Sequence, residues 1–403
     1  MSKNSNKALI GIFAFCATCM ANNMTLSIIA YIMQSYPNES STTVLTIATT
    51  PALVAMVFAF FVGSLITRFS TKSVLLFTQF ALFCEGMLFM FLGHTSIYLL
   101  WFAAGLVGFS QGSTNTFVGT LLAANVKDDG KRATLTGICT AVMNVGGVAF
   151  TMVGGVIAVN GWQKAYGLWF IILIAIVLEF LFIPADKPAT AAPGAGAQKA
   201  EKQKMPALVW LISFHYLFYF MFLYAFGSNI SEYIINVYKL GTSVEAGIAT
   251  SAVTAGGVVA GAIFGAYSKV LKKWTVPVMV GFAAVGLALC LFLTNNIFGA
   301  YIGGLLCGFS MSGAAPYVIM FMQQITDSPA QYGKAMSIWS GFMNIGMFIA
   351  VYFLAFCAQL FTGSSTDIHS KFVVATIGAV LCMVTSVPLY VRKTKADEAS
   401  AAE

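Results

Sequence analysis

Parts of one segment of the chain occur a second time 200 positions later. This segment is residues 108–147, GFSQGSTNTFVGTLLAANVKDDGKRATLTGICTAVMNVGG. Gly108-Phe109-Ser110 returns as Gly308-Phe309-Ser310, and Met143-Asn144-Val145-Gly146 returns as Met343-Asn344-Ile345-Gly346. Single short matches are common between apolar sequences, but several matches in one order at one offset are not. The pattern therefore predicts an internal duplication, because a fixed period is the signature of a repeated architecture.

Two further matches agree with this duplication. Ile47-Ala48-Thr49-Thr50 is answered by Ile248-Ala249-Thr250-Ser251, 201 positions later. Between the main matches, Arg132-Ala133 is answered by Lys334-Ala335, two residues out of step. The repeat thus extends over most of two similar halves.

The composition argues against a soluble protein. The chain has 403 residues, of which 59% are hydrophobic and only 9% are charged, and its mean hydropathy is +0.84. A soluble domain carries roughly 25% charged residues, so this chain lacks the charges to cover a water-exposed surface. Apolar runs recur along the whole length, which predicts a polytopic membrane protein. In such a protein, two related halves are typical of a transporter whose solute site lies where the halves meet.

Twelve apolar runs are long enough to span a bilayer, since a spanning helix needs about 20 apolar residues. The predicted spans are 8–33, 44–67, 73–92, 97–124, 133–158, 166–184, 207–236, 243–267, 275–294, 298–324, 335–360 and 372–391. The run that starts at Ala8 has no convincing signal-peptide cleavage site, so we interpret it as a retained first helix. Residues 186–205, DKPATAAPGAGAQKAEKQKM, are polar and have the composition of a flexible linker.

We therefore predict an all-α membrane protein with twelve transmembrane helices in two pseudo-symmetric six-helix bundles. The predicted parts are an N-terminal bundle at 1–185, a cytoplasmic linker at 186–206, a C-terminal bundle at 207–391 and a cytoplasmic tail at 392–403.

The placement of the basic residues predicts the orientation, because Lys and Arg are retained on the cytoplasmic side. With the N-terminus inside, all but three of the 21 Lys and Arg residues fall in inside segments, and the exceptions are Lys164, Lys239 and Lys371. Both termini are then cytoplasmic in a cell membrane. The formal charge of +7 is explained as a topology signal and a contact for anionic lipid heads, and no nucleic acid partner is expected.

No residue pattern predicts catalysis, a cofactor or a metal site. The eight Cys residues all fall inside apolar runs without metal-type spacing and partners, so we interpret them as small apolar residues. A Gly-rich loop ending in Lys-Ser/Thr is lacking, which argues against ATP-driven transport by this chain. Paired carboxylates, His-rich sets and Ser/His/Asp arrangements are also lacking.

The loop after the second span resembles a motif of the major facilitator superfamily, Gly-x-Leu-x-Asp-Arg-x-Gly-x-Arg/Lys. This chain has Gly63-Ser64-Leu65-Ile66-Thr67-Arg68-Phe69-Ser70-Thr71-Lys72. The first Gly, the Leu, the Arg and the final Lys are kept, while Thr67 and Ser70 replace the Asp and the second Gly. The resemblance implies that Gly63, Arg68 and Lys72 belong to a gating loop.

Other stretches are similar to the same family. Gln111-Gly112 matches the end of its fourth-helix pattern Arg-x-x-Gln-Gly, with Gly108 in place of the Arg. Gly146 and Gly154-Gly155 fit a fifth-helix pattern of its antiporters, with Phe150-Thr151 in place of Gly-Pro. Together with twelve spans, two similar halves and a long central linker, the resemblance covers the whole chain and implies a secondary transporter.

An Asn pair is the first candidate for the solute site. Lipid offers no hydrogen bonds, so polar side chains at membrane depth tend to face protein or a water-filled cavity. Asn144 and Asn344 lie near the middle of their spans, and each has a hydroxyl one turn earlier, at Thr140 and Ser340. The repeat predicts two related half-sites that face each other. The alternative is helix packing, in which Asn, Ser and Thr are also common.

Three amides are candidates of the same kind, with the same alternative. Gln111 and Asn115 lie four residues apart on the fourth span. On the first span, Asn22 and Asn23 cannot both face one direction, and we favour Asn22 as the solute contact.

Aromatic residues crowd the seventh span, where Tyr219 and Tyr224 are candidates for a pocket that takes a flat or partly apolar organic solute. The alternative is that these rings fill helix contacts. Trp339, one turn before Met343, either caps the same cavity or anchors its helix at the cytoplasmic interface.

Ionisable residues at membrane depth are few: Glu85, Glu179 and His215, with no Lys or Arg inside a core segment. A desolvated carboxyl without a cationic partner favours its neutral form. A Glu85 carboxyl that gains and loses a proton with conformation is therefore a candidate for coupling transport to a proton gradient. The lack of a deep cation favours a neutral, zwitterionic or cationic solute over a phosphate ester.

The sequence thus predicts a secondary transporter of a small organic solute that works by rocking two halves about a midplane site. Uptake, efflux and exchange stay open, as do the solute and the coupling ion. A non-transporting membrane receptor on the same scaffold is the alternative. The expected partners are the solute, the lipid bilayer and, if coupled, a proton, with the chain acting as a monomer.

Overall fold

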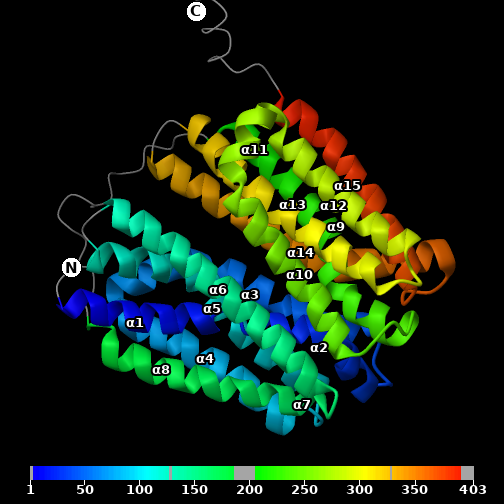
Figure 1. Cartoon of the computed structure of the whole chain (residues 1–403), viewed down its shortest axis with the longest axis horizontal. Coiled ribbons are helices and arrows are strands. Elements are labelled where there is room, and N and C mark those ends of the chain that lie inside the picture. The colour runs from blue at the N-terminus through cyan, green and yellow to red at the C-terminus, as the bar shows by residue number, and fades with distance from the viewer. Residues whose placement is uncertain (1–2, 127–128, 186–204, 327–328, 392–403) are drawn as a thin grey trace, which may run out of the picture.

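The computed structural model describes residues 3–126, 129–185, 205–326 and 329–391, and every regular element in this part of the chain is a helix. The first half of the molecule, residues 3–185, contains α1 (Lys3–Thr18), α2 (Asn23–Ser35), α3 (Ser41–Arg68), α4 (Thr71–Leu92), α5 (Ile97–Asn125), α6 (Asp129–Ala158), α7 (Trp162–Ala165), the 3₁₀ turn η1 (Tyr166–Trp169) and α8 (Phe170–Phe182). The second half, residues 205–391, contains α9 (Ala207–Glu232), the π-turn η2 (Tyr233–Val237), α10 (Ser243–Ala262), α11 (Phe264–Leu271), the 3₁₀ turn η3 (Lys272–Trp274), α12 (Thr275–Phe292), α13 (Ile297–Gln324), α14 (Pro329–Thr362) and α15 (Ile368–Tyr390). The two halves lie side by side in Figure 1.

Eleven helical segments of the described residues are long and apolar enough to cross a membrane. The fourth predicted span corresponds to α5, which has 29 residues and is as long as the others. α5 is not one of these eleven segments. The all-α, multi-span architecture predicted from the sequence is confirmed.

Short polar residues begin many of these helices. Their side chains accept a backbone N–H of the first turn, which would otherwise have no partner. The residues that cap in this way are Ser40, Ser70, Ser96, Thr242, Asn296 and Asp367. At α10 the cap is reciprocal, because Glu245 returns a bond to the backbone N–H of Thr242 (2.6 Å). Local sequence thus fixes where the spans start.

The same helix pairs pack in both halves. α1 packs on α6 and α8 as α9 packs on α14 and α15, and α5 packs on α3 and α4 as α13 packs on α10 and α12. The apolar cores follow the halves: one cluster contains only second-half residues, and the other two contain first-half residues plus Val351. This equivalence of contacts is the structural form of the sequence repeat.

The repeated motif supplies a close helix contact in each half. A Cβ on Gly146 would lie 2.1 Å from the Ala17 carbonyl oxygen of α1, and a Cβ on Gly346 would lie 2.2 Å from the Leu217 carbonyl oxygen of α9. Such distances are too short for any side chain, so α6 and α14 approach their neighbours this closely only because these positions are glycine.

The first span differs from the continuous helix expected over 8–33. It divides into α1 and α2, and between them Ala21 N donates to the Thr18 carbonyl (3.0 Å), so the turn is tighter than α-helical. Of the predicted linker at 186–206, only Met205 and Pro206 are among the described residues, and the predicted tail at 392–403 lies outside them.

Candidate functional site

The two halves are joined by hydrogen bonds from α2 to the end of α9 and to the π-turn η2 that follows it. Gln34 Nε2 donates to Asn236 Oδ1 (2.8 Å), and Ser231 Oγ donates to the Ser27 carbonyl (2.8 Å). α2 ends at Ser35 and α9 starts at Ala207, so these bonds lie at the end of the molecule away from the start of α9. α6 also packs on α10 and α3 on α14, which gives the junction two equivalent contacts.

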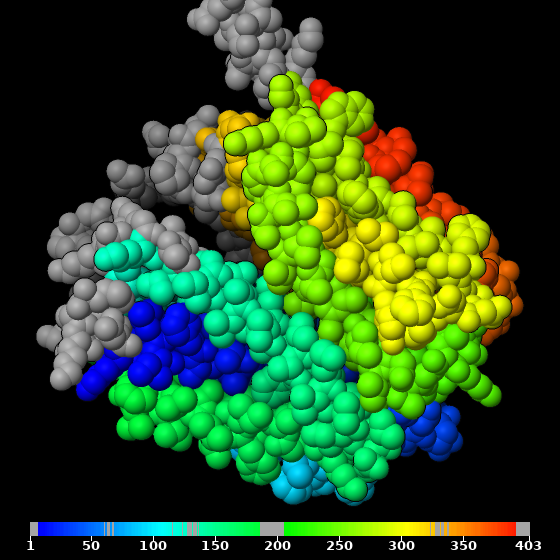
Figure 2. Space-filling view, in the orientation of Figure 1, coloured from blue at the N-terminus to red at the C-terminus, as the bar shows by residue number. Residues whose placement is uncertain are grey.

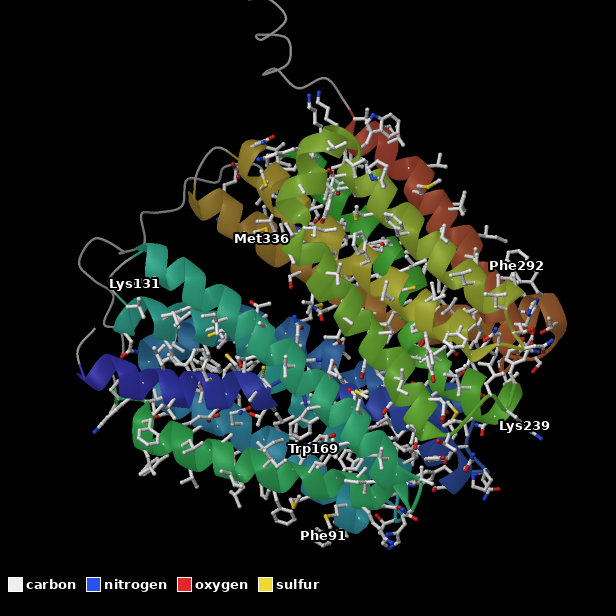
Figure 3. All side chains as sticks on the ribbon, in the orientation of Figure 1. Phe91, Lys131, Trp169, Lys239, Phe292 and Met336 are labelled. Atoms are coloured by element: carbon white, nitrogen blue, oxygen red, sulfur yellow. The ribbon has the colours of Figure 1, made fainter. Side chains whose placement is uncertain are left out.

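At the opposite end the halves diverge. Figure 2 shows a recess between them where α6 and α10 separate. Lys131 of α6 and Met336 of α14 lie on its two sides, whereas Lys239 and Phe292 lie at the far end of the second half (Figure 3). We call this space the central recess.

Helical spacing places Asn144 and Asn344 on the faces that look across the junction. Thr151 follows Asn144 by two turns and lies against α10, where a Cβ on Gly247 would be 3.1 Å from the Thr151 carbonyl oxygen. Val351 follows Asn344 by two turns and packs into an apolar cluster of the first half. Both Asn side chains are half-buried, and Asn344 Nδ2 also donates to the Ser340 carbonyl of its own helix (2.8 Å).

The neighbouring polar candidates differ in exposure. Gln111 and Thr140 are exposed, and Ser340 is half-buried. The side chain of Asn115 lies outside the part of the chain that the structure describes.

The two tyrosine candidates of α9 have different surroundings. Tyr219 is fully buried, and its hydroxyl forms a 2.6 Å hydrogen bond with Ser310 Oγ of α13, inside the second half. The Tyr224 hydroxyl donates to the Ala48 carbonyl of α3 (3.2 Å), so this side chain crosses between the halves. In this conformation Tyr219 makes a helix contact and Tyr224 lies at the junction.

Trp339 lies in a buried aromatic group of the second half. Its ring centroid is 5.2 Å from that of Tyr216. The His215 ring lies 6.0 Å from Tyr216 and 6.2 Å from Tyr390, so the four rings form a chain. His215 Nε2 bonds the Cys382 carbonyl (2.8 Å). Among the described residues, Trp339 Nε1, Tyr216 Oη, Tyr390 Oη and His215 Nδ1 are buried without a hydrogen-bond partner.

The tight turn of the first span turns its two Asn residues in different directions. Asn22 Oδ1 accepts from Thr25 Oγ1 (3.0 Å), which in turn bonds the Tyr166 hydroxyl (2.9 Å) within the first half. Asn23 lies against α6, where a Cβ on Gly147 would be 3.2 Å from Asn23 Nδ2. The sequence favoured Asn22 over Asn23 as the solute contact. In the structure Asn22 contacts its own half and Asn23 contacts α6.

Two carboxyls are buried inside the first half. Glu85 is 0% exposed, and neither of its oxygens has a hydrogen-bond partner among the described residues. Glu179, also 0% exposed, accepts at Oε1 from Gln79 Nε2 (3.0 Å). Gln79 Nε2 also donates to Thr18 Oγ1 (2.9 Å), and its Oε1 accepts from Ser110 Oγ (3.4 Å). Both carboxyls therefore face protein.

The sequence analysis did not single out Gln79 or Thr18. Their hydrogen-bond partners lie 61 to 100 positions away in the chain.

The loop between α3 and α4 carries the family-like motif. Arg68, the last residue of α3, is exposed. Lys72 Nζ donates to the Phe180 carbonyl of α8 (2.6 Å) and lies 4.8 Å from the centre of the Phe180 ring, which ties the start of α4 to the end of α8. The side-chain environment of Gly63 lies outside the description.

One cation corrects the sequence interpretation. The sequence predicted no Lys or Arg inside a core segment and placed Lys371 in an outside segment. In the structure Lys371 lies in the first turn of α15 and is only 1% exposed. Glu232, at the end of α9, is 7% exposed and interacts electrostatically with Lys371. α15 begins four residues earlier than the predicted span at 372, because Asp367 caps it, and this draws Lys371 into the bundle.

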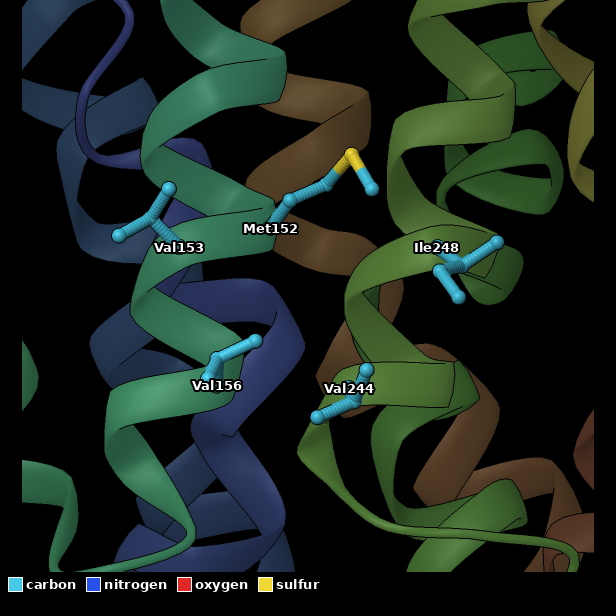
Figure 4. Close-up of a pocket in the computed structure, with 5 residues that line it drawn as sticks. All are labelled: Met152, Val153, Val156, Val244 and Ile248. Carbon is cyan, nitrogen blue, oxygen red and sulfur yellow. The ribbon is translucent and has the colours of Figure 1, made fainter.

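A cavity of about 260 Å³ lies between α6 and α10, lined by Met152, Val153, Val156, Val244 and Ile248 (Figure 4). All five lining side chains are apolar, so the cavity has no group that could orient a polar solute. Within the described residues, no set of three or more His, Cys, Asp or Glu side chains could hold a metal ion.

Comparisons with known proteins agree with this architecture. The family model described as Major Facilitator Superfamily matches residues 11–331 and 245–403. No curated protein sequence matches the chain. The structure is similar to that of the nucleoside transporter NupG, solved as a point variant, with a TM-score of 0.73 and 12% identity over 95% of this chain and 99% of that chain.

Two other solved structures are similar over nearly their whole length. A D-xylose-proton symporter gives a TM-score of 0.70 and 14% identity over 97% of this chain and 98% of that chain. An auto-inhibited peptide transporter of the POT family gives a TM-score of 0.71 and 11% identity over 96% of this chain and 97% of that chain. At such identities these likenesses establish the fold alone.

Proposed function

The chain belongs to the major facilitator superfamily, and we propose that it is a secondary transporter that moves a small organic solute across the membrane by alternating access. It is a multi-pass membrane protein of a family and fold that are those of transporters and not, in general, of enzymes. The observation that carries the proposal is the placement of Asn144 and Asn344. They come from equivalent helices, lie half-buried near mid-span, and occupy the faces that look from each half toward the other.

We propose the central recess as the solute path. Asn144, Asn344, Thr140, Ser340 and Gln111 would contact the solute through amides and hydroxyls. Asn22, Asn115, Tyr224 and Trp339 are further candidates, and Tyr219 would join them only if its bond to Ser310 opened. A set of amides, hydroxyls and aromatic rings suits a neutral, zwitterionic or cationic solute. The buried Lys371 does not change this inference, because it lies at the start of α15, beyond the hydrogen-bonded end of the junction.

The basic residues support an orientation with both termini in the cytoplasm of a cell. In that orientation the central recess opens inward and the bonds of Gln34 and Ser231 close the outer side. The predicted domains, 1–185 and 207–391, would rock about these contacts, with Arg68 and Lys72 in the inner gating loop. A single chain contains both halves of such a site, so we propose that a monomer suffices.

A proton is the coupling ion that this chain is equipped to use. Two carboxyls, Glu85 and Glu179, are buried in the first half, and burial of a charge in a membrane protein is costly, by about 2.5–3.5 kcal/mol at a helix centre. A carboxyl that holds its proton avoids that cost, and one that releases the proton in another conformation would couple transport to protons.

The test starts with a thermal-shift screen of small organic solutes on the purified protein at two pH values. A solute that stabilises the protein is then used for flux into proteoliposomes. Asn144→Ala and Asn344→Ala should each weaken binding about tenfold or more, the equivalent of one good hydrogen bond to a buried partner. Asn160→Ala, at an exposed position just beyond α6, is the control.

Equal binding and flux in all three variants would return the Asn pair to a packing role. Binding without flux in the unchanged protein would favour the receptor alternative over a transporter.

A further inference from the structure

The buried carboxyl of Glu179 has one oxygen without a hydrogen-bond partner, and this points to a ligand. One oxygen, Oε1, accepts from Gln79, but Oε2 is buried with no hydrogen-bond partner among the described residues. Buried polar atoms are almost always satisfied, and an ionised carboxylate would demand more donors than a neutral acid. Within the described residues no ion pair to Glu179 is found that could neutralise it. A proton on the carboxyl is the smallest ligand that removes the charge.

The amide of Gln79 is fixed by its own bonds. Its two N–H hydrogens go to Glu179 Oε1 (3.0 Å) and Thr18 Oγ1 (2.9 Å), and its oxygen accepts from Ser110 Oγ (3.4 Å). All four residues of this group are 0–2% exposed, and they come from α8, α4, α1 and α5. The group is thus a continuous hydrogen-bonded connection from a titratable acid to α1.

That connection ends at the break in the first span. Thr18 is the last residue of α1, its hydroxyl lies 3.1 Å from the Ala14 carbonyl, and its own carbonyl accepts from Ala21 N in the tight turn. The turn leads to Asn22, the candidate solute contact on this span, and then to Asn23. A change at Glu179 therefore has a physical route to the turn between α1 and α2.

Glu85 lacks such a route. Neither of its oxygens has a partner among the described residues, although Tyr166 lies close enough to interact electrostatically. The neighbouring residue, Gly86, packs on Trp169, whose Cδ1 would be 2.1 Å from a Cβ there (Figure 3). Glu85 is enclosed by rings, while Glu179 is enclosed by hydrogen-bonding groups.

The other titratable groups around Glu179 are thiols on two helices. Cys16 and Cys19 of α1 interact with its charge, and Cys139 of α6 is coupled to Cys16. On the side of α4, Lys72 is engaged with the Phe180 carbonyl and ring one residue further along α8. None of these groups adds a carboxylate or an imidazole that would titrate in the same pH range.

We propose that Glu179 is a proton-binding site inside the first half, and that Gln79 and Thr18 connect its protonation to the turn between α1 and α2. This inference rests on the proposed transport function and names the group that would couple it to protons. Release breaks the O–H bond of the carboxyl, leaves the electron pair on Oε2 and passes the proton to water. Glu179 lies three residues before the end of α8, roughly 4.5 Å along the axis, so the path to one membrane face is short.

Ionisation would then act on the turn. A carboxylate binds an N–H donor more strongly than a neutral acid does. It would draw the Gln79 amide toward α8 and weaken its bond to Thr18, which releases the end of α1.

Infrared difference spectroscopy of the purified full chain during a pH titration tests the site without any solute. The C=O stretch of a protonated carboxyl disappears on ionisation and shifts in D₂O. The unchanged protein should lose one such band as the pH rises, and Glu179→Gln should lack that titrating band. Glu85→Gln and Glu232→Gln, which remove the other buried carboxyls, should both keep it.

Gln79→Met keeps the side-chain length but removes the donor, and serves if Glu179→Gln does not fold. The band should then persist to a pH about one unit higher, since a hydrogen bond to a charged group is worth roughly that much. An identical titration in Glu179→Gln, or no titrating band in the unchanged protein, would overturn the proposal. Failure of the transport proposal would leave the titration intact, because no solute takes part in it.

Discussion

Substitution of Gly155 by Val should open the outer junction. α6 meets α10 here so closely that a Cβ on Gly155 would lie 2.6 Å from the Ser243 carbonyl oxygen. The Ser243 hydroxyl donates to the Gly155 carbonyl at the same contact. Because the obstructing atom belongs to the backbone of α10, it cannot rotate away, and the two helices must separate.

The magnitude follows from the two losses. Overpacking of a tight contact costs about 1–3 kcal/mol, and a lost hydrogen bond adds about 1 kcal/mol. Both penalties apply only while the outer ends of α6 and α10 are in contact, so they bias the equilibrium between the closed and open junction. A bias of about 2 kcal/mol changes the ratio of the two states about 30-fold.

Distances between spin labels report the shift. Cys84 and Cys357, the two native thiols that are not fully buried, are first replaced by Ala, and labels are placed at exposed Glu39 and Ser364 on the two halves. Pulsed electron resonance should show a longer distance population that grows in Gly155→Val.

Gly119→Val is the matched control for this experiment, because nothing lies within 4 Å of a Cβ at that position. If Gly155→Val is folded and its label distances equal those of the control, the contact does not hold the junction closed, and the reasoning above fails.

Three further results are expected. Gln34→Cys with Asn236→Cys should be joined by a short bifunctional maleimide, visible by mass spectrometry of the peptides, because the tips of the parent side chains hydrogen-bond at 2.8 Å; no crosslink would mean that the junction is open in the membrane. Gly146→Leu and Gly346→Leu should each lower the free energy of unfolding by about 1–3 kcal/mol, seen as similar falls in melting temperature, because both face a carbonyl oxygen of the neighbouring helix; a large effect at only one site would deny their equivalence. Tyr219→Phe should destabilise the protein by about 1 kcal/mol without changing solute affinity, since its hydroxyl bonds buried Ser310; a change in affinity at unchanged stability would make Tyr219 a solute contact instead.

The parts of the fold that the sequence predicted are those written in local patterns. Apolar length predicts the spans without knowledge of distant residues, although α15 begins four residues before the predicted span because Asp367 caps it. The break after Thr18 has no comparable signal, because the stretch from Ala17 to Asn22 contains neither Pro nor Gly. The partnership of Gln79 with Glu179 is equally hidden, since it depends on how α4 and α8 pack.

Burial of charge was the other point that local sequence could not settle. Lys371 follows Asp367 by one turn and comes directly after Ser370, which is typical of the exposed start of a helix. Only the position of α9 decides otherwise, because Glu232 at its end lies near enough to interact with the ammonium group. The burial of Lys371 therefore arises from tertiary packing, which the prediction of no Lys or Arg inside a core segment did not address.

The repeated motif Met-Asn-x-Gly bears on two interpretations that the sequence left as alternatives, a solute site and helix packing. On an α-helix, residues two positions apart are separated by about 200° around the axis, so Asn144 and Gly146 face nearly opposite sides. Gly146 faces α1 of its own half at contact distance, and Gly346 faces α9 in the same way. The glycine therefore serves packing, and the same geometry turns the asparagine away from its own bundle. α6 packs on α10 and α14 packs on α3, so each copy of the motif lies on a helix that contacts the other half, and that is the arrangement a shared solute site requires.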